Sequence, residues 1–289
     1  MAKPLDTADF RAIRIVLEPD DFAVSDDKPD RPTNLVDKKT WHGIADLPDD
    51  VSIRTSNHQG TILKELYALQ STWTSHAIGE DQDILFEVLL YTIDELDAAL
   101  FNALHGYYRQ AIGCLRNIVE LVLFGTHCQM AQDTIILEQW QAGQYENSFG
   151  GTCTLLVQNA PVQALNAFLR STVNDTIIDR RNVPQSGGWA RRLYAELCGY
   201  SHSRPNATNV GLWRSNGPIY VPRAFMITAS LYAETLAFCY LLIKLVRPSL
   251  TLPKAVEEQL ASYKQEESMG LAYQAYQRLF YQKSTLSGK

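Results

Sequence analysis

The residues with the clearest chemical potential in this sequence are the arginines around His202. Between Arg170 and Arg223 the chain carries eight arginines, no lysine and three carboxylates. An arginine fork grips phosphate through paired hydrogen bonds and keeps its charge at any physiological pH. A histidine adds the side chain that exchanges protons near pH 7. Aromatic rings that could stack on bases stand in the same stretch: Trp189, Tyr200 and Trp213. The stretch therefore predicts a site that handles RNA or phosphate. Alternatively, the arginines lie on several faces and pair with the acidic N-terminal segment.

A second charged group stands in an apolar segment. Arg116 and Glu120 are four residues apart, so they share one face of a helix, and Asn117 follows the arginine. Most of their neighbours are apolar, so the two charges must be satisfied by each other or by a partner such as His202. Two interpretations stay open: an ion pair that fixes helix packing, or a part of the same site.

Several signatures of known sites do not occur in the sequence. There is no Gly-x-x-x-x-Gly-Lys-Ser/Thr loop for nucleotide phosphates and no His-Glu-x-x-His pair for zinc. The six histidines show no ligand spacing: His42, His58, His76, His105, His127 and His202. The five cysteines include no Cys-x-x-Cys pair: Cys114, Cys128, Cys153, Cys198 and Cys239. We therefore expect no metal, no cofactor, and buried thiols in a reducing compartment.

The segment Gly199-Tyr200-Ser201-His202-Ser203 nearly matches the Gly-x-Ser-x-Gly elbow of α/β-hydrolases. That elbow needs a strand before the serine and a helix after it. Here a helical pattern precedes the serine, and Arg204-Pro205 follows it. The context is reversed, which argues against a hydrolase of that class.

Apolar residues recur at helical spacing over most of the chain after residue 60. The predicted helices are 60–73, 81–104, 105–130, 132–144, 153–158, 162–170, 189–200, 224–246 and 253–281. No strand–helix–strand alternation appears, which excludes dinucleotide-binding and barrel architectures. Ser215-Asn216-Gly217 is a good turn between the extended segments around Val210 and Val221. The sequence predicts an all-α bundle or array with one short β-hairpin.

Residues 1–56 differ from the rest of the chain. They carry twelve acidic against eight basic residues, and prolines at positions 4, 19, 29, 32 and 48 interrupt helical patterns. Residues 12–17 and 51–54 read as short strands. We predict an acidic, partly extended N-terminal arm at residues 1–56 and a helical domain at residues 57–289.

The composition limits the cellular location and the binding partners that we expect for this protein. The net charge of -6 argues against non-specific coating of nucleic acid, although it permits a local basic site. Residues 1–20 contain no apolar core of a leader peptide. Residues 225–246 are long enough to span a bilayer, but Glu234 near their middle makes a core helix the preferred interpretation. We expect a cytoplasmic protein without a membrane partner.

Two segments resemble helices of bacterial HEPN-like proteins. Tyr108–Glu120 reads YRQAIGCLRNIVE and resembles their Ala-x-x-x-Leu-Arg-x-x-x-Glu helix. Leu193–His202 reads LYAELCGYSH and resembles their later Leu-Tyr-x-x-Leu-Ser-x-x-x-His helix. The order and separation of the segments also agree, and the resemblance covers about residues 85–246.

The resemblance implies an all-α bundle that is often dimeric. Active members of the superfamily are metal-independent ribonucleases, and many are toxins or antiphage effectors. They use an Arg-x(4–6)-His motif, in which the arginine stabilises the scissile phosphate and the histidine transfers protons. Here no arginine stands four to six residues before His202, so the two groups would converge from different helices.

The hypothesis assigns roles to named residues. His202, Arg116 and Glu120 are the candidate catalytic residues: the acid–base, the phosphate ligand and the residue that orients either of them. The candidate phosphate- and RNA-binding residues are Arg191, Arg192, Arg204, Asn117, Tyr200 and Ser201. The alternative is a non-catalytic helical interaction module that binds a partner protein. We expect RNA or a protein as partner, and a homodimer.

Overall fold

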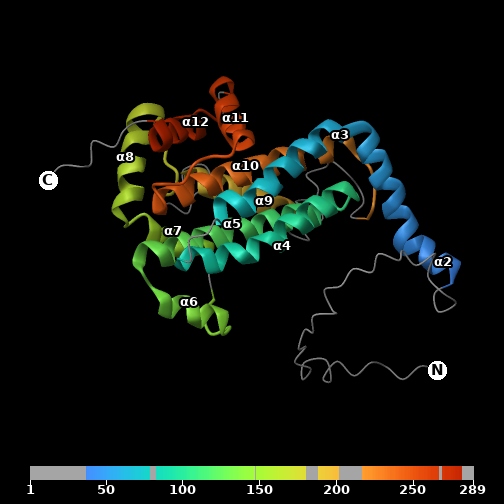
Figure 1. The fold of residues 1–289 in the computed structure, drawn as a ribbon, viewed down its shortest axis with the longest axis horizontal. Helices are drawn as coiled ribbons and strands as arrows, with labels where there is room; N and C mark the ends of the chain where they lie inside the picture. The colour runs from blue at the N-terminus through green and yellow to red at the C-terminus, as the bar shows by residue number, and fades with distance from the viewer. Residues whose placement is uncertain are drawn as a thin grey trace. The chain divides into compact units, whose positions relative to one another are not determined.

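All regular secondary structure in the described part of the chain is helical (Figure 1). The structure is a computed structural model that describes residues 37–78, 83–146, 148–179, 188–201, 217–266 and 269–281. No strand occurs within these ranges. The all-α class predicted from the spacing of the apolar residues is therefore confirmed.

The chain divides into two compact units, Met1–Ile44 and Ala45–Lys289. The described part of the first unit contains the short helix α2 (Lys38–Trp41). Its N-cap, Asp37, accepts hydrogen bonds from the backbone N–H groups of Lys39 and Thr40, both at 3.0 Å. Residues 1–36 of the predicted acidic arm lie outside the described residues. The predicted division after residue 56 falls inside a helix of the second unit, α3 (Leu47–Trp73).

Helix α3 corrects the prediction of an extended arm at residues 47–56. Pro48 stands in the first turn, where its missing N–H breaks no helical bond, so this proline starts the helix. The strand predicted at residues 51–54 is wrong, because a short apolar run does not distinguish a strand from a helix. The helix bends at Gln59, whose backbone is non-helical, and Figure 1 shows the bend. Gln59 donates a hydrogen bond to the hydroxyl of Tyr220 at 2.9 Å, and His58 stacks on the same ring.

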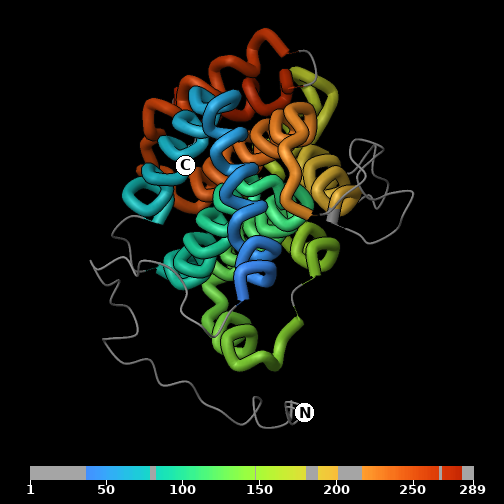
Figure 2. Tube along the Cα trace, turned by 90° about the vertical axis from the view of Figure 1, so that its right-hand side faces the viewer, coloured from blue at the N-terminus to red at the C-terminus, as the bar shows by residue number. Residues whose placement is uncertain are grey.

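Three long helices form the centre of the second unit: α4 (Ile84–Leu104), α5 (Tyr108–Ala131) and α10 (Pro222–Val246). Helix α5 contacts both of the others, and the two views place it among them (Figures 1 and 2). Leu115, Val119 and Val122 of α5 are fully buried, as their helical spacing predicts. A Cβ on Gly125 would meet Leu85 at 2.8 Å, so this glycine allows α4 to approach α5 closely.

Four shorter helices follow α5: α6 (Thr134–Gln141), α7 (Phe149–Leu156), α8 (Ala160–Val173) and α9 (Gly188–Ser201). Asp133 caps α6 and Ser148 caps α7, each by accepting a backbone N–H. The N-terminus of α9 is held by the carbonyl of Thr176, which accepts from the backbone N–H of Trp189 at 2.9 Å. Helices α7 and α9 both pack against α5.

The last helix predicted from the sequence is two helices. Helix α11 (Lys254–Ser262) continues into a short 3-10 turn, Tyr263–Gln265, and α12 (Gly270–Tyr276) begins after a break. Glu266 at the break has an extended backbone. The break lets α12 turn back and pack against α8 as well as α11. A single helix over 253–281 is therefore wrong.

The predicted β-hairpin lies mostly outside the described residues, including Val210 and Asn216. Of its second half, residues 217–221 are described and contain no strand. They are anchored instead by side chains: the backbone N–H of Val221 donates to the hydroxyl of Tyr108 at 3.1 Å.

Helices α5 and α10 are long and apolar enough to cross a membrane by length and composition. However, 67% and 78% of their most apolar windows are buried inside the fold, as in core helices.

Candidate functional site

The two charged residues predicted on α5 meet a tyrosine from α9. Arg116 and Glu120 form an ion pair with 2.9 Å between the guanidinium Nη2 and a carboxylate oxygen. The hydroxyl of Tyr194 accepts from Nε at 3.0 Å and from Nη2 at 2.7 Å, and it donates to Glu120. These contacts do not use Nη1 of the arginine. The side chain of Arg116 is 32% exposed, so this Arg116–Glu120–Tyr194 cluster is accessible to a ligand.

Aromatic packing fixes the position of the tyrosine. The ring of Tyr194 stacks on Phe149, the first residue of α7, with 3.8 Å between the ring centroids and 5° between the planes. The guanidinium of Arg191 lies over the other ring of this pair, 5.9 Å from the centroid of Phe149. The guanidinium of Arg116 lies 5.2 Å from the centroid of Tyr194. The cluster is therefore held by three helices, α5, α7 and α9.

Arg116 and Tyr194 keep their protons at neutral pH. Burial of Tyr194, together with its hydrogen bond to Glu120, raises the pKa of the phenol, so the hydroxyl stays a donor. Burial lowers the pKa of Arg116, but the Tyr194 bond and the charge of Glu120 outweigh it and the net pKa is raised. Cys198, one turn after the tyrosine, also acts on both groups electrostatically. Arg116 is thus a permanent cation beside a neutral phenol.

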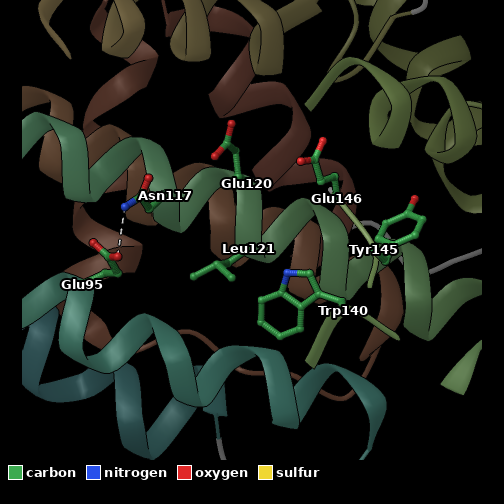
Figure 3. A pocket seen from close by; sticks show the side chains of 7 residues that line it. All are labelled: Glu95, Asn117, Glu120, Leu121, Trp140, Tyr145 and Glu146. Carbon is green, nitrogen blue, oxygen red and sulfur yellow. Dashed lines mark hydrogen bonds between the residues drawn. The ribbon is translucent and has the colours of Figure 1, made fainter. Parts of the chain in front are cut away.

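Glu120 also lines a cleft of about 450 Å³ (Figure 3). We call it the acidic cleft; its lining residues are Glu95, Asn117, Glu120, Leu121, Trp140, Tyr145 and Glu146. They come from α4, α5, α6 and the segment after α6. Figure 3 shows the side chains of Glu120 and Glu146 on the same side of the cleft, and the bond from Asn117 to Glu95, which measures 3.0 Å. The carboxylates make the cleft unsuited to phosphate.

Two aromatic residues form one wall of the acidic cleft. Trp140 and Tyr145 both pack on Phe124, with centroid distances of 5.4 and 5.9 Å. Tyr91 of α4 also contacts the tryptophan, edge to face. These contacts belong to a small hydrophobic cluster that is separate from the main core. Helix α6 and its loop thereby fold back over α5.

The two predicted arginines of α9 contact different partners. Arg192 forms two hydrogen bonds with the carboxylate of Asp175, at 3.1 and 2.6 Å. Arg191 instead lies over Phe149, next to the cluster. Arg170 pairs with Asp179 at 3.9 Å. Part of the positive charge predicted for this stretch is therefore balanced by its own carboxylates.

The aromatic residues predicted to stack on bases are buried where they are described. Tyr200 is 7% exposed and Trp189 is 3% exposed. The indole N–H of Trp189 donates to Glu234 at 2.6 Å. Both rings pack in the core, so neither offers a face to a nucleotide base.

The remaining predicted site residues fall at or beyond the end of α9. His202, Arg204 and Trp213 lie outside the described residues. Ser201 is the last residue of α9, and its side chain also lies outside the described part. The distance from Arg116 to His202, on which the nuclease hypothesis depends, is therefore not among the described contacts.

The sequence predicted Arg116, Glu120, Asn117 and Arg191 as site residues but not the other residues around them. Tyr194 carried a signal, since it stands in the second segment of the resemblance. Phe149 and the cleft residues Glu95, Trp140 and Glu146 carried none, because each comes from a different helix or loop and no spacing relates them.

No group of three or more histidine, cysteine or acidic side chains in the described ranges is arranged to hold a metal ion. Comparisons with known protein families, with curated proteins and with solved structures find no match to this chain.

Proposed function

We propose that this chain is a HEPN-like helical protein that binds RNA at the Arg116–Glu120–Tyr194 cluster and cleaves it without a metal, as a toxin or antiphage effector. The observation that carries the proposal is the convergence of the two segments of the resemblance. Residues 116 and 120 of the first and residue 194 of the second meet in one partly exposed, hydrogen-bonded cluster. His202 follows α9 directly and would act as the acid–base.

Electrostatics favours one direction of approach for an RNA phosphate. The carboxylates of the acidic cleft repel a phosphate on the α4 and α6 side of Glu120. Arg116 and Arg191 lie over the two stacked rings, Tyr194 and Phe149, and Nη1 of Arg116 is not used by the cluster's own bonds. A phosphate that binds Nη1 of Arg116 would meet a guanidinium that the cluster already holds in position.

A cleavage assay tests the enzymatic proposal. The full chain is incubated with tRNA and total RNA in EDTA, beside His202→Ala and Arg116→Lys. We expect cleavage by the unaltered chain and a loss of roughly 10²- to 10⁴-fold in either variant. Arg170→Ala is the matched control, because its side chain is 58% exposed and its ion pair with Asp179 is long at 3.9 Å. No cleavage by the unaltered chain, or equal cleavage by His202→Ala, would refute the proposal.

The second candidate function is a non-catalytic module that binds a basic segment of a partner protein. The acidic cleft favours it, since carboxylates and aromatic rings together attract lysine and arginine side chains. Glu120 engages Arg116 internally, so the cluster would then be structural.

Binding of an arginine-rich peptide, followed by fluorescence anisotropy at two salt concentrations, separates this candidate from the first. Here Glu146→Gln should weaken binding, whereas Glu138→Gln on the exposed face of α6 should not. Equal peptide binding by both variants would exclude the cleft as the binding surface.

A further inference from the structure

The acidic cleft follows helix α5 for about two turns. At one end, Glu95 accepts the hydrogen bond from Asn117. Glu120 and Leu121 line the cleft one turn further along the helix. At the other end, the aromatic wall packs on Phe124, one more turn along. The helix rises by roughly 10 Å from residue 117 to residue 124, so the cleft suits an extended ligand.

Carboxylates and apolar side chains alternate in the lining of the cleft. Figure 3 shows Leu121 between Glu95 and the ring of Trp140. Glu120 and Glu146 add two more carboxylates to the lining. None of the described residues that line the cleft is basic. The lining therefore suits a ligand that carries several positive charges with apolar segments between them.

We propose that the acidic cleft binds a linear aliphatic polyamine, which is a chain of protonated amines separated by methylene groups. The ammonium groups pair with Glu95, Glu120 and Glu146. The methylene groups cover Leu121, and an ammonium group against the ring of Trp140 gains a cation–π contact. A metal ion would not use this apolar lining, and no group of three or more described histidine, cysteine or acidic side chains is arranged to hold one.

Glu120 connects the polyamine site to the Arg116–Glu120–Tyr194 cluster, because the same carboxylate pairs with Arg116 and lines the cleft. An ammonium group at Glu120 competes with Arg116 for this carboxylate. It also neutralises part of the negative charge that repels a phosphate. Both effects favour a phosphate at Arg116, so the polyamine and RNA should each strengthen the binding of the other. This coupling rests on the RNA binding proposed above, whereas the polyamine site itself does not.

Isothermal titration calorimetry of the full chain with spermidine, in the absence of RNA, tests the polyamine site. Spermidine should bind more tightly than putrescine, a shorter diamine, and much more tightly than butylamine, which carries one charge. Glu95→Gln and Glu146→Gln should each raise the dissociation constant roughly two- to fivefold, as expected for the loss of one partly exposed ion pair. Glutamine at position 95 retains an oxygen that can accept from Asn117, so this variant should keep the fold.

The matched control is Glu138→Gln, which removes an exposed carboxylate of α6 that does not line the cleft. It should leave the dissociation constant unchanged. An equal loss in Glu138→Gln, or no loss in Glu95→Gln, would show that spermidine acts only as a counter-ion and would overturn the site. The absence of any spermidine binding would overturn it as well.

A 2′-O-methyl RNA oligonucleotide tests the coupling, because its blocked 2′-oxygens prevent cleavage. Its affinity is measured with and without spermidine, at the dissociation constant of spermidine, for the unaltered chain and for the double variant Glu95→Gln/Glu146→Gln. Spermidine also binds RNA directly, but this effect is the same for both chains. We expect spermidine to raise the RNA affinity of the unaltered chain about twofold more than that of the double variant.

The two failures are distinguishable. The same effect of spermidine on RNA binding by both chains would overturn the coupling. The absence of RNA binding in both chains would refute the proposed RNA function and the coupling with it, whereas the calorimetry still decides the polyamine site.

Discussion

Replacement of Arg247 by alanine should remove a large part of the stability of this fold. Arg247 is the C-cap of α10, and its side chain is 6% exposed. It donates two hydrogen bonds to the carboxylate of Asp83, at 2.8 and 2.5 Å. It also donates to the carbonyl oxygens of Ala77 and Ile78, at 2.6 and 3.0 Å. One guanidinium therefore connects the end of α10 to the start of α4 and to the π-helical turn Thr74–Ile78, which follows α3.

The magnitude follows from what the substitution leaves behind. Removing one partner of a buried ion pair costs about 3–5 kcal/mol, because the other charge and its neighbours lose their partners. Asp83 is 22% exposed, so water can solvate it in part and the lower end of that range applies. Arg247→Ala should therefore lower the free energy of unfolding by about 3 kcal/mol. Asp83→Ala should cost more, since Asp83 also caps α4 by accepting the backbone N–H of Phe86 at 2.8 Å.

Urea unfolding followed by circular dichroism measures both losses, and the double variant gives the coupling between them. The control is Lys254→Ala, because its ion pair with Glu258 is highly exposed and should contribute less than about 1 kcal/mol. A loss below about 1 kcal/mol for Arg247→Ala would mean that this contact does not hold the three elements together.

Three further predictions concern other parts of the fold. Burial raises the pKa of Glu234 above its ordinary value of 4.5, so this carboxyl stabilises the folded chain at acid pH and loses that contribution as the pH rises above 4.5. Glu234→Gln should therefore make the urea midpoint higher and less dependent on pH between pH 5 and 8. Gly106→Ala should destabilise the fold by roughly 2 kcal/mol or more in thermal melts, because φ is +79° and the new Cβ would lie 2.4 Å from a backbone oxygen. The control is Gly113→Ala, which has open space in mid-helix and should stabilise the fold by up to about 1 kcal/mol. Tyr194→Phe should cost about 1–2 kcal/mol in urea unfolding, since the ring stack remains and the hydroxyl bridge to Arg116 is lost; no change would show that the bridge does not stabilise the fold.

The spacing of apolar residues was enough to place the central helices. The predicted ranges 81–104, 105–130 and 224–246 differ from α4, α5 and α10 by a few residues at their ends. A long amphipathic pattern repeats the same local signal over several turns, so its type is unambiguous. The first half of α3 lacked such a pattern and has a proline in its first turn, and the prediction there was wrong.

The division between local and tertiary information is clearest in the Arg116–Glu120–Tyr194 cluster. The chain itself sets Arg116 and Glu120 on one helical face, because four residues make about one turn. It does not set Tyr194 against them from 78 positions away, nor Glu146 and Trp140 across the acidic cleft. Those neighbours depend on how α6, α7 and α9 pack on α5, and packing is decided by the shapes of many side chains at once. Short stretches of sequence thus determine the helices, whereas the site forms only where the folded helices bring distant residues together.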